Sequence, residues 1–370
     1  MPFLAGTLIV LSLLGTTLDW KPARSDYTWS FPQDHWARNG YRTEWWYFTG
    51  HLRTRGETPR RFGYQFTFFR VGLQPTAPPL DSAWTARDAI MGHAAVTDLM
   101  NKRHLFTEIL YRATPLLGQF GDGSSSLIAW SRPPAGSSGR WSLHWNGKGF
   151  DLAASDEGRD FSFRLTTRGT KGPVFQGPNG YSIKGGDEGA ASQYYSFTRM
   201  ATGGRVSIGG EEHAVEGVSW MDKEFGSNQL GARQIGWDWF SLQLDDGRDL
   251  MLYLLRDRRN RVDFANGTLI SKEGRTRYLG PEEWSVRATG AWASPHNGAR
   301  YPAGWRLQVP GEGLELMVTP EVPDSENVSR LLPGLAYWEG PVRVETPSGG
   351  SIGQGYVELT GYAERSRPAL

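Results

Sequence analysis

Two carboxylates follow a tryptophan near the middle of the chain, and these residues are the best suited to chemistry. In the segment EGVSWMDKEFGS, residues 216–227, strand alternation would place Trp220, Asp222 and Glu224 on one face. A carboxylic acid that an apolar site keeps protonated near neutral pH can donate a proton to an alkene, and aromatic faces can stabilise the resulting cation. We therefore predict Asp222 and Glu224 as catalytic residues, with Asp222 as the proton donor.

The aromatic partners of this acid would come from the segment GWDWFSLQL, residues 236–244, which brings Trp237 and Trp239. A cation over one aromatic ring gains about 0.5–2 kcal/mol. General acid catalysis typically contributes a factor of about 100 to 10,000. The carboxyl group therefore decides whether this site could be catalytic.

A related pattern occurs earlier in the chain. EWWYFTGHL, residues 44–52, is followed by FGYQFTFFR, residues 62–70, and GWDWFSLQL is followed in the same way by RDLMLYLLR, residues 248–256. Each copy reads as two strands joined by a turn-rich connection, which predicts a β-hairpin that ends on arginine. In the first copy Glu44 is a candidate ion-pair partner for Arg70. The repetition indicates a duplicated β-domain.

These segments supply the predicted ligand-binding residues, which are Glu44, Trp45, Trp46, Arg70, His93, Tyr195, Trp220, Trp237 and Trp239. A structural role is the alternative for each group. Tandem tryptophans often pack cores and domain interfaces, the charged residues could form buried ion pairs, and His93 could be a hydrogen-bonded core histidine.

Composition favours β-structure in two domains. The chain has 370 residues, and its 47 Gly and 22 Pro separate short runs rich in aromatic residues and valine, without sustained helical periodicity beyond the N-terminus. The strand from Thr43 has aromatic residues on both faces, with Trp45 and Tyr47 on one and Trp46 and Phe48 on the other. This pattern predicts a barrel wall whose inner face lines an apolar cavity and whose outer face packs on a second domain.

Several classes of function are disfavoured. Lys plus Arg (40) balance Asp plus Glu (39), and no basic cluster is long enough to follow a phosphate backbone, so we expect no nucleic-acid partner. There is no cysteine, and the seven histidines show no metal-ligand spacing. The Gly-x-Ser-x-Gly sequence at residues 349–353 leads into a predicted strand and not into the helix that a nucleophile elbow requires. We therefore predict no metal and no cofactor, and the chain gives no support for a serine hydrolase.

The first residues carry an uncharged run, Phe3 to Leu18. It is too short and too interrupted by Thr and Gly for a confident membrane span, so a secretory signal is the better interpretation, although no Lys or Arg precedes it. An uncleaved anchor or a misassigned start codon is the alternative. We expect an exported protein, periplasmic or secreted, in which residues 1–24 are signal or anchor plus linker.

Eight ordered motifs resemble the AttH/CrtC family of two-domain, lipocalin-like proteins, which includes carotenoid 1,2-hydratases and predicted secreted hydrolases. They are EWWYFTGHL, TFFR, GHAAVTD, YYSFTR, SWMDKEFGS, GWDWFSLQLDDG, YWEGPVRV and GYVELTGY, and the resemblance covers about residues 31–365. It implies an all-β fold of two tandem calycin-type antiparallel barrels packed together, in residues 25–225 and 226–370, and an apolar ligand. In the carotenoid hydratases histidines flank the aspartate, whereas Met221 and Lys223 stand here, so only Asp222 carries over.

Three functions follow as expectations. The first is binding or delivery of a lipid-like or isoprenoid molecule near the junction of the barrels. The second is a hydratase, isomerase or cyclase that acts on an apolar polyene, and the third is an accessory role in an ABC-type export complex. An acid catalyst requires an Asp222 pKa well above 4, whereas a structural ion pair requires one below it. We expect a monomer or a weak oligomer.

Overall fold

The computed structural model describes residues 20–79, 82–187, 189–231 and 233–363, and these contain strands and short 3-10 helices but no α-helix. The predicted all-β fold is confirmed. The N-terminal apolar run, on which the prediction of export rests, lies outside the described residues. Within them, no helix is long and apolar enough to cross a membrane.

The first sheet is antiparallel throughout and has the order β4-β3-β2-β1-β13-β12-β9-β8-β7-β6-β5. Short strands β10 and β11 pair with β12 at its start. The strands are β1 (Thr43–Thr54), β2 (Arg61–Gly72), β3 (Asp88–Asp98), β4 (Arg103–Arg112), β5 (Gly118–Phe120), β6 (Leu127–Ser131), β7 (Trp141–Trp145), β8 (Phe150–Asp156), β9 (Phe161–Gly169), β10 (Val174–Phe175), β11 (Tyr181–Ile183), β12 (Ala191–Ile208) and β13 (Glu211–Asn228).

The second sheet has the order β17-β16-β15-β14-β25-β24-β22-β21-β18, with β23 paired to β24 and a separate hairpin of β19 and β20. Its strands are β14 (Gln234–Leu244), β15 (Asp249–Asp257), β16 (Val262–Ile270), β17 (Thr276–Leu279), β18 (Ser285–Ala288), β19 (Ala291–Ala293), β20 (Arg300–Pro302), β21 (Trp305–Val309), β22 (Leu314–Pro320), β23 (Glu326–Val328), β24 (Ala336–Glu345) and β25 (Ser351–Leu359). The four 3-10 helices are η1 (Gln33–His35), η2 (Glu157–Arg159), η3 (Pro178–Gly180) and η4 (Pro310–Glu312).

Both predicted hairpins are present. β1 pairs with β2, so that Glu44 lies opposite Arg70, and β14 pairs with β15 around the turn at Gly247. Gly247 has a φ of 92°, a conformation that favours glycine.

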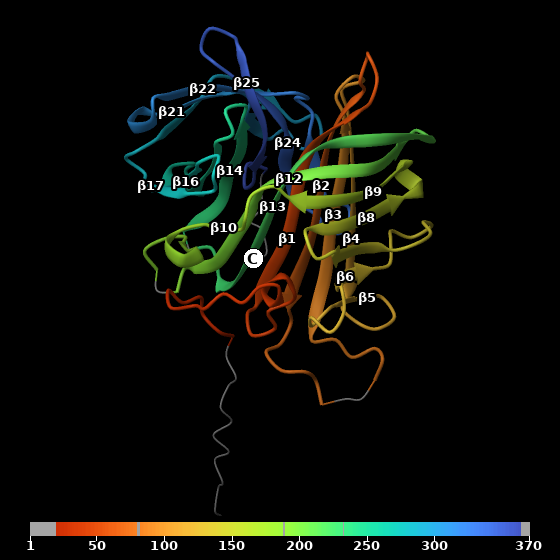
Figure 1. The fold of residues 1–370 in the computed structure, drawn as a ribbon. Helices are drawn as coiled ribbons and strands as arrows, with labels where there is room; N and C mark the ends of the chain where they lie inside the picture. The colour runs from red at the N-terminus through yellow and green to blue at the C-terminus, as the bar shows by residue number, and fades with distance from the viewer. Residues whose placement is uncertain (1–19, 80–81, 188, 232, 364–370) are drawn as a thin grey trace, which may run out of the picture.

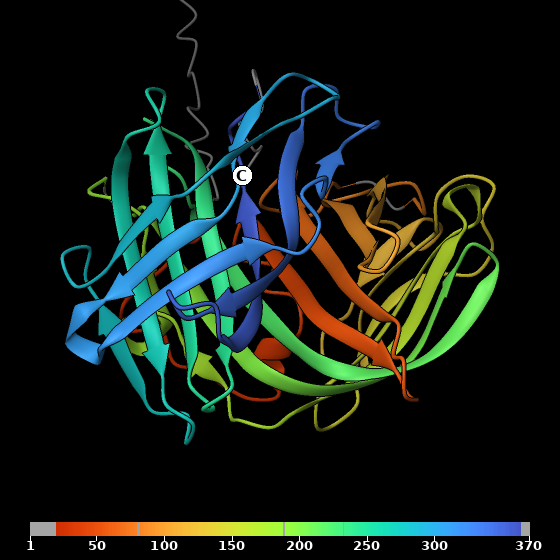
Figure 2. The ribbon, with the colours of Figure 1, turned by 90° about the horizontal axis from the view of Figure 1, so that it is seen from above.

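The two sheets lie side by side, each curved around its own core (Figures 1 and 2). β1 contacts β25 and β2 contacts β24, so the repeated hairpins and their neighbours form the junction. The first core contains Trp46, Phe48 and Phe66, and the second contains Phe240, Trp305 and Trp338. A third apolar cluster fills the junction itself and includes Tyr47, Trp220, Trp239, Tyr253 and Tyr356.

One face of β1 packs toward the second domain, as predicted, but the apolar cavity lies on this outer face and not inside the barrel. Trp46 and Phe48 point inward into a filled barrel core, whereas Trp45 and Tyr47 point outward to the junction, where the apolar cavity lies. The barrel interior is filled because strands β7 to β9 and the segment before β1 supply further large side chains, including Trp141, Phe150 and Phe163. Alternation on one strand identifies two apolar faces but does not distinguish a core from an interface.

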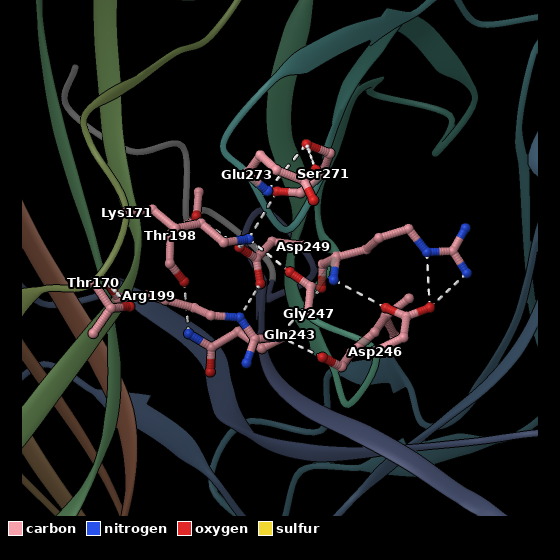
Figure 3. Close-up of polar contacts among 12 residues, drawn as sticks. Thr170, Lys171, Thr198, Arg199, Gln243, Asp246, Gly247, Asp249, Ser271 and Glu273 are labelled. Carbon is pink, nitrogen blue, oxygen red and sulfur yellow. Dashed lines mark hydrogen bonds and ion pairs between the residues drawn. The ribbon is translucent and has the colours of Figure 1, made fainter.

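A buried polar cluster fixes the barrels to each other at the edge of the junction (Figure 3). The Lys171 ammonium is 2.6 Å from an Asp249 carboxylate oxygen and donates to the carbonyl oxygens of Gly247 and Ser271. Arg199 binds the other Asp249 oxygen at 2.7 Å. Lys171 and Arg199 belong to the first barrel and Asp249 to the second, so this cluster ties the two domains together.

Replacing Asp249 with asparagine is expected to lower the free energy of unfolding by about 1–3 kcal/mol, because the buried lysine and arginine lose their anionic partner. Asp246→Asn in the neighbouring exposed turn is the control, since Asp246 pairs with Arg248 at the surface, and should change stability by less than about 0.5 kcal/mol. Urea denaturation measures both variants. Equal effects would show that the cluster does not hold the barrels together.

Candidate active site at the junction of the barrels

A cavity of about 300 Å³ lies between the outer face of the first sheet and the second sheet. Its wall is mostly apolar and aromatic, which suits an apolar ligand. The side chains that line it include Trp45, Tyr47, Phe69, Met91, His93, Leu110, Tyr194, Leu230, Trp237, Trp239, Tyr253, Leu255, Leu332, Leu335 and Tyr337, together with the ionisable residues Glu44, Arg70, Lys184, Asp222, Glu224 and Glu358.

Asp222 is the central polar group of this wall. It lies on β13, is 3% exposed, and accepts hydrogen bonds from the Tyr194 hydroxyl at 2.7 Å, the Trp220 indole N–H at 2.8 Å and the Ser196 hydroxyl at 2.5 Å. In the described part of the chain no Lys or Arg lies within 4 Å of its carboxyl oxygens. Burial raises the pKa of Asp222 to about 7, and the charge of Glu224 also raises it. The three hydrogen bonds act in the other direction and lower the pKa, but burial outweighs them.

Glu224, two residues further along the same face, has a different environment. Its carboxylate lies 2.7 Å from the Lys184 ammonium and also accepts a hydrogen bond from Ser192. Burial alone would lower the pKa of Lys184, but Glu224 holds it above its ordinary value. The Lys184 ammonium also lies 4.5 Å from the ring centre of Tyr253. Of the two predicted catalytic carboxylates, Glu224 is therefore the one in an ion pair, and Asp222 is the one without a cation.

A further carboxyl group on the cavity wall, that of Glu358, was absent from the sequence predictions. Glu358 on β25 lies directly across from Glu339 on β24 and accepts a hydrogen bond from the Trp237 indole at 3.0 Å. Burial raises the pKa of Glu358 to about 7, and the charges of Asp222 and Glu224 add to the effect. Burial and the charge of Glu358 raise the pKa of Glu339 well above its ordinary value. Two carboxyls with raised pKa values, Asp222 and Glu358, thus face the same cavity.

Glu44 and Arg70 line one end of the cavity, but their charges are already neutralised. Glu44 is bound by Arg70 and by Lys223, and Arg70 also pairs with Asp88 at 2.7 Å. Burial would raise the pKa of Glu44, but Lys223 and Arg70 together hold it below its ordinary value. The Lys223 ammonium lies 3.4 Å from the ring centre of Trp46. These contacts make the group a buried ion cluster at the cavity wall.

The structure brings most of the predicted ligand-binding residues to the cavity, namely Glu44, Trp45, Arg70, His93, Trp237 and Trp239. The His93 imidazole bonds to the Tyr337 hydroxyl at 2.6 Å, and burial lowers its pKa to about 4, so the ring is neutral at pH 7. Trp220 does not line the cavity and reaches the site only through its bond to Asp222.

Trp46 and Tyr195 do not reach the cavity and belong to the core of the first barrel. The Trp46 indole donates to the backbone oxygen of His35, and the Tyr195 hydroxyl bonds to the His35 ring at 2.6 Å. The neighbour Tyr194 points to the cavity in place of Tyr195, because alternate residues of β12 face opposite sides. Ser196 lies opposite Asp222 in the β12–β13 pairing, so register between these strands would have identified Tyr194 and Ser196 together.

The described residues contain no group of three or more His, Cys, Asp or Glu side chains arranged to hold a metal ion. The cavity wall itself offers carboxyl, hydroxyl and indole groups, among them those of Asp222, Tyr194 and Trp237. A protonated carboxyl beside aromatic faces in a water-poor cavity can transfer a proton to an apolar, unsaturated molecule.

Two tandem antiparallel barrels define a lipocalin-like, two-domain protein. A family model described as AttH-like matches residues 22–362, and the chain belongs to the AttH-like family. This confirms the resemblance identified from the sequence motifs.

Solved structures agree with the family. The crystal structure of an AttH protein from Nitrosomonas europaea has a TM-score of 0.80 and 30% identity, covering 93% of this chain and 100% of that one. Kievitone hydratase from Nectria haematococca has a TM-score of 0.65 and 15% identity, covering 92% and 97%. CghA has a TM-score of 0.50 and 11% identity, covering 87% and 89%. At these lower identities the last two show a shared fold alone. No curated protein sequence matches the chain significantly.

Proposed function

We propose that this protein binds an apolar, unsaturated small molecule in the junction cavity and protonates it with Asp222, as a hydratase or isomerase would. The observation that carries the proposal is the position of Asp222, a buried carboxyl on an aromatic cavity wall. Its oxygens have hydrogen-bond donors but no Lys or Arg within 4 Å among the described residues. One structural neighbour, kievitone hydratase, is a hydratase by name.

The proposed reaction begins with transfer of the Asp222 proton to one carbon of a double bond, which leaves a cation on the other carbon. The rings of Trp237 and Trp239, on the same cavity wall, would stabilise this cation. In a hydration, water then adds to the cation and Glu358 accepts the proton that the water releases. In an isomerisation, Glu358 instead accepts a proton from a neighbouring carbon, and the electrons of that C–H bond form the new double bond. Either step leaves Asp222 to be reprotonated before the next turnover.

Binding without turnover is the second candidate function, and the apolar lining of the cavity favours it. The two functions share the ligand, so the first experiment is to purify the protein gently and to analyse it by native mass spectrometry with organic extraction. A bound apolar molecule is the expected result. A protein that is empty, and that also fails to bind or convert a panel of polyenes and lipids, would contradict both functions.

Filling the cavity should abolish binding. Ala89 on β3 lines the cavity, so Ala89→Trp is expected to reduce ligand recovery and ligand affinity at least about tenfold by occupying the space. Ala288→Trp on exposed strand β18 is the control and should bind normally. Fluorescence titration with the extracted ligand measures both. Unchanged binding by the Ala89 variant would place the ligand elsewhere.

Export and a partnership with an ABC-type complex remain proposals from the sequence. Fractionation of cells that produce the full chain would test the first, and co-purification of a transporter subunit would test the second.

A further inference from the structure

The cavity reaches the surface at one end of the molecule. Its lining residues come from the beginnings or ends of strands, among them Thr43 at the start of β1, Val71 near the end of β2 and Glu358 near the end of β25. Leu110 near the end of β4 both lines the cavity and is 37% exposed. We call this end of the molecule, with the connections that join these strand ends, the cavity end.

Most of the large apolar side chains that are exposed in the described part of the chain lie at the cavity end. Besides Leu110 they are Leu73, Trp84, Leu116, Ile183, Val262 and Leu331. Leu73 and Trp84 belong to the connection between β2 and β3 and are 57% and 54% exposed. Scattered exposed apolar residues are normal, but a gathering of them at the mouth of an apolar cavity marks an interaction surface.

The same end carries an excess of positive charge, although the whole chain has a net charge of only +1. Three of its carboxylates are in ion pairs: Asp26 with Arg24, Asp257 with Arg261 and Asp263 with Arg233. Asp187 is exposed and has no basic side chain within 4 Å among the described residues. Other basic residues of these connections are exposed and have no carboxylate within 4 Å among the described residues. They are Lys21, Arg42, Arg112, Arg258, Arg259 and Arg330.

The N-terminal apolar run joins the folded part at this end as well. Trp20 packs against Gly72, the last residue of β2, and the Arg87 guanidinium lies 5.7 Å from its ring centre. Trp20 therefore lies beside the start of the β2–β3 connection, and the uncharged sequence Phe3 to Leu18 precedes it in the chain.

We propose that the cavity end docks on an anionic lipid bilayer. Exposed Trp and Leu side chains enter the interfacial region, unpaired Lys and Arg contact acidic headgroups, and the cavity mouth faces the membrane. A protein partner would fit the apolar residues equally well, but the unpaired basic residues around them and the adjoining apolar run favour a lipid surface. An apolar molecule would then pass between bilayer and cavity without crossing water.

Hydroxyl-radical footprinting of the full-length protein tests the docking directly. With vesicles of phosphatidylcholine and phosphatidylglycerol, Trp84 should become protected from oxidation, whereas Met100 should stay reactive. Met100 is the internal control, because it is 59% exposed and lies in the β3–β4 turn at the opposite end. Vesicles of phosphatidylcholine alone should protect Trp84 much less. The proposal would be overturned if the protein did not bind the vesicles or bound both kinds equally. It would also be overturned if the protein bound while Trp84 stayed as reactive as in solution, because the N-terminal run alone would then hold the protein.

Variants give a second measurement. The double variant Leu73→Asp with Trp84→Asp should bind anionic vesicles about tenfold or more weakly, because both interfacial contacts are lost and negative charge is added. Met100→Asp should bind like the wild-type protein. Both sites are exposed, and circular dichroism confirms that each variant is folded. Equal affinity of the two variants in vesicle co-sedimentation would contradict docking through the cavity end.

Discussion

Asp222→Asn is expected to reduce turnover of an alkene ligand about 100- to 10,000-fold with little change in ligand affinity. Asparagine cannot donate the proton, yet it has the shape of the protonated aspartic acid. Its oxygen can accept the bonds from Trp220 and Ser196, and its amide group can donate to the Tyr194 oxygen. Steady-state kinetics with the ligand identified by extraction measures the effect. Unchanged turnover would eliminate Asp222 as the acid.

The same substitution, although it lowers turnover, is expected to raise the free energy of unfolding at neutral and higher pH. Because the folded-state pKa of Asp222 is about 7 and the unfolded value is about 3.9, the folded protein holds this proton more tightly. Stability should therefore fall as pH rises from about 4 through 7, and Asp222→Asn should remove this loss. The variant should be more stable than the wild-type protein at pH 8, by on the order of 2–4 kcal/mol, and similar to it at pH 4. Identical pH dependence of the two proteins would show that Asp222 is already ionised in the fold.

Glu44→Ala is the prediction with the largest expected effect on stability, about 3–5 kcal/mol, because it leaves buried Arg70 and Lys223 without the carboxylate that binds both. Glu44 has a lowered pKa, so its contribution is present above the unfolded pKa of about 4.3 and is lost as pH falls through the folded value. Urea denaturation at pH 7 and at low pH measures this.

Glu216→Ala is the control for that variant, since Glu216 pairs with Arg53 and Arg55 on the surface and should contribute less than about 1 kcal/mol. The Glu44 variant should also approach the wild-type protein in stability as the pH is lowered. A Glu44 variant that is as stable as the Glu216 variant at pH 7 would show that the ion cluster does not stabilise the junction.

The architecture could be predicted from the sequence because its strands and turns depend on local patterns. Strand alternation, turn residues and the repeated aromatic hairpin are visible within short windows, and the ordered motifs identified the family that the AttH-like match confirms. These patterns could not predict which apolar face of β1 points into the barrel core and which points to the junction of the two barrels. That depends on which distant strands cover each face, and Trp141 and Phe163, which fill the first barrel, lie about a hundred residues away.

The candidate site was predicted only in part, because local patterns identify single residues but not their contacts with distant segments. Asp222 and Trp237 were found because each stands in a dense motif. Glu358 and Glu339 stand in the motifs GYVELTGY and YWEGPVRV, but their alternation did not show that the two carboxyls lie across from each other. The hydrogen bond from Trp237 to Glu358 joins segments far apart in the chain. Lys184 forms the ion pair that neutralises Glu224 and so distinguishes it from Asp222. It lies in a connection with no recognisable pattern.

The protonation state of Asp222 decides whether this residue can act as the proton donor. Infrared difference spectra between the wild-type protein and Asp222→Asn, recorded across a pH series, isolate the carboxyl of this one residue. We expect the band of a protonated carboxylic acid at pH 5, replaced by carboxylate bands around pH 7. A carboxylate that persists down to pH 4 would contradict this expectation and would make Asp222 a structural hydrogen-bond acceptor in a binding protein.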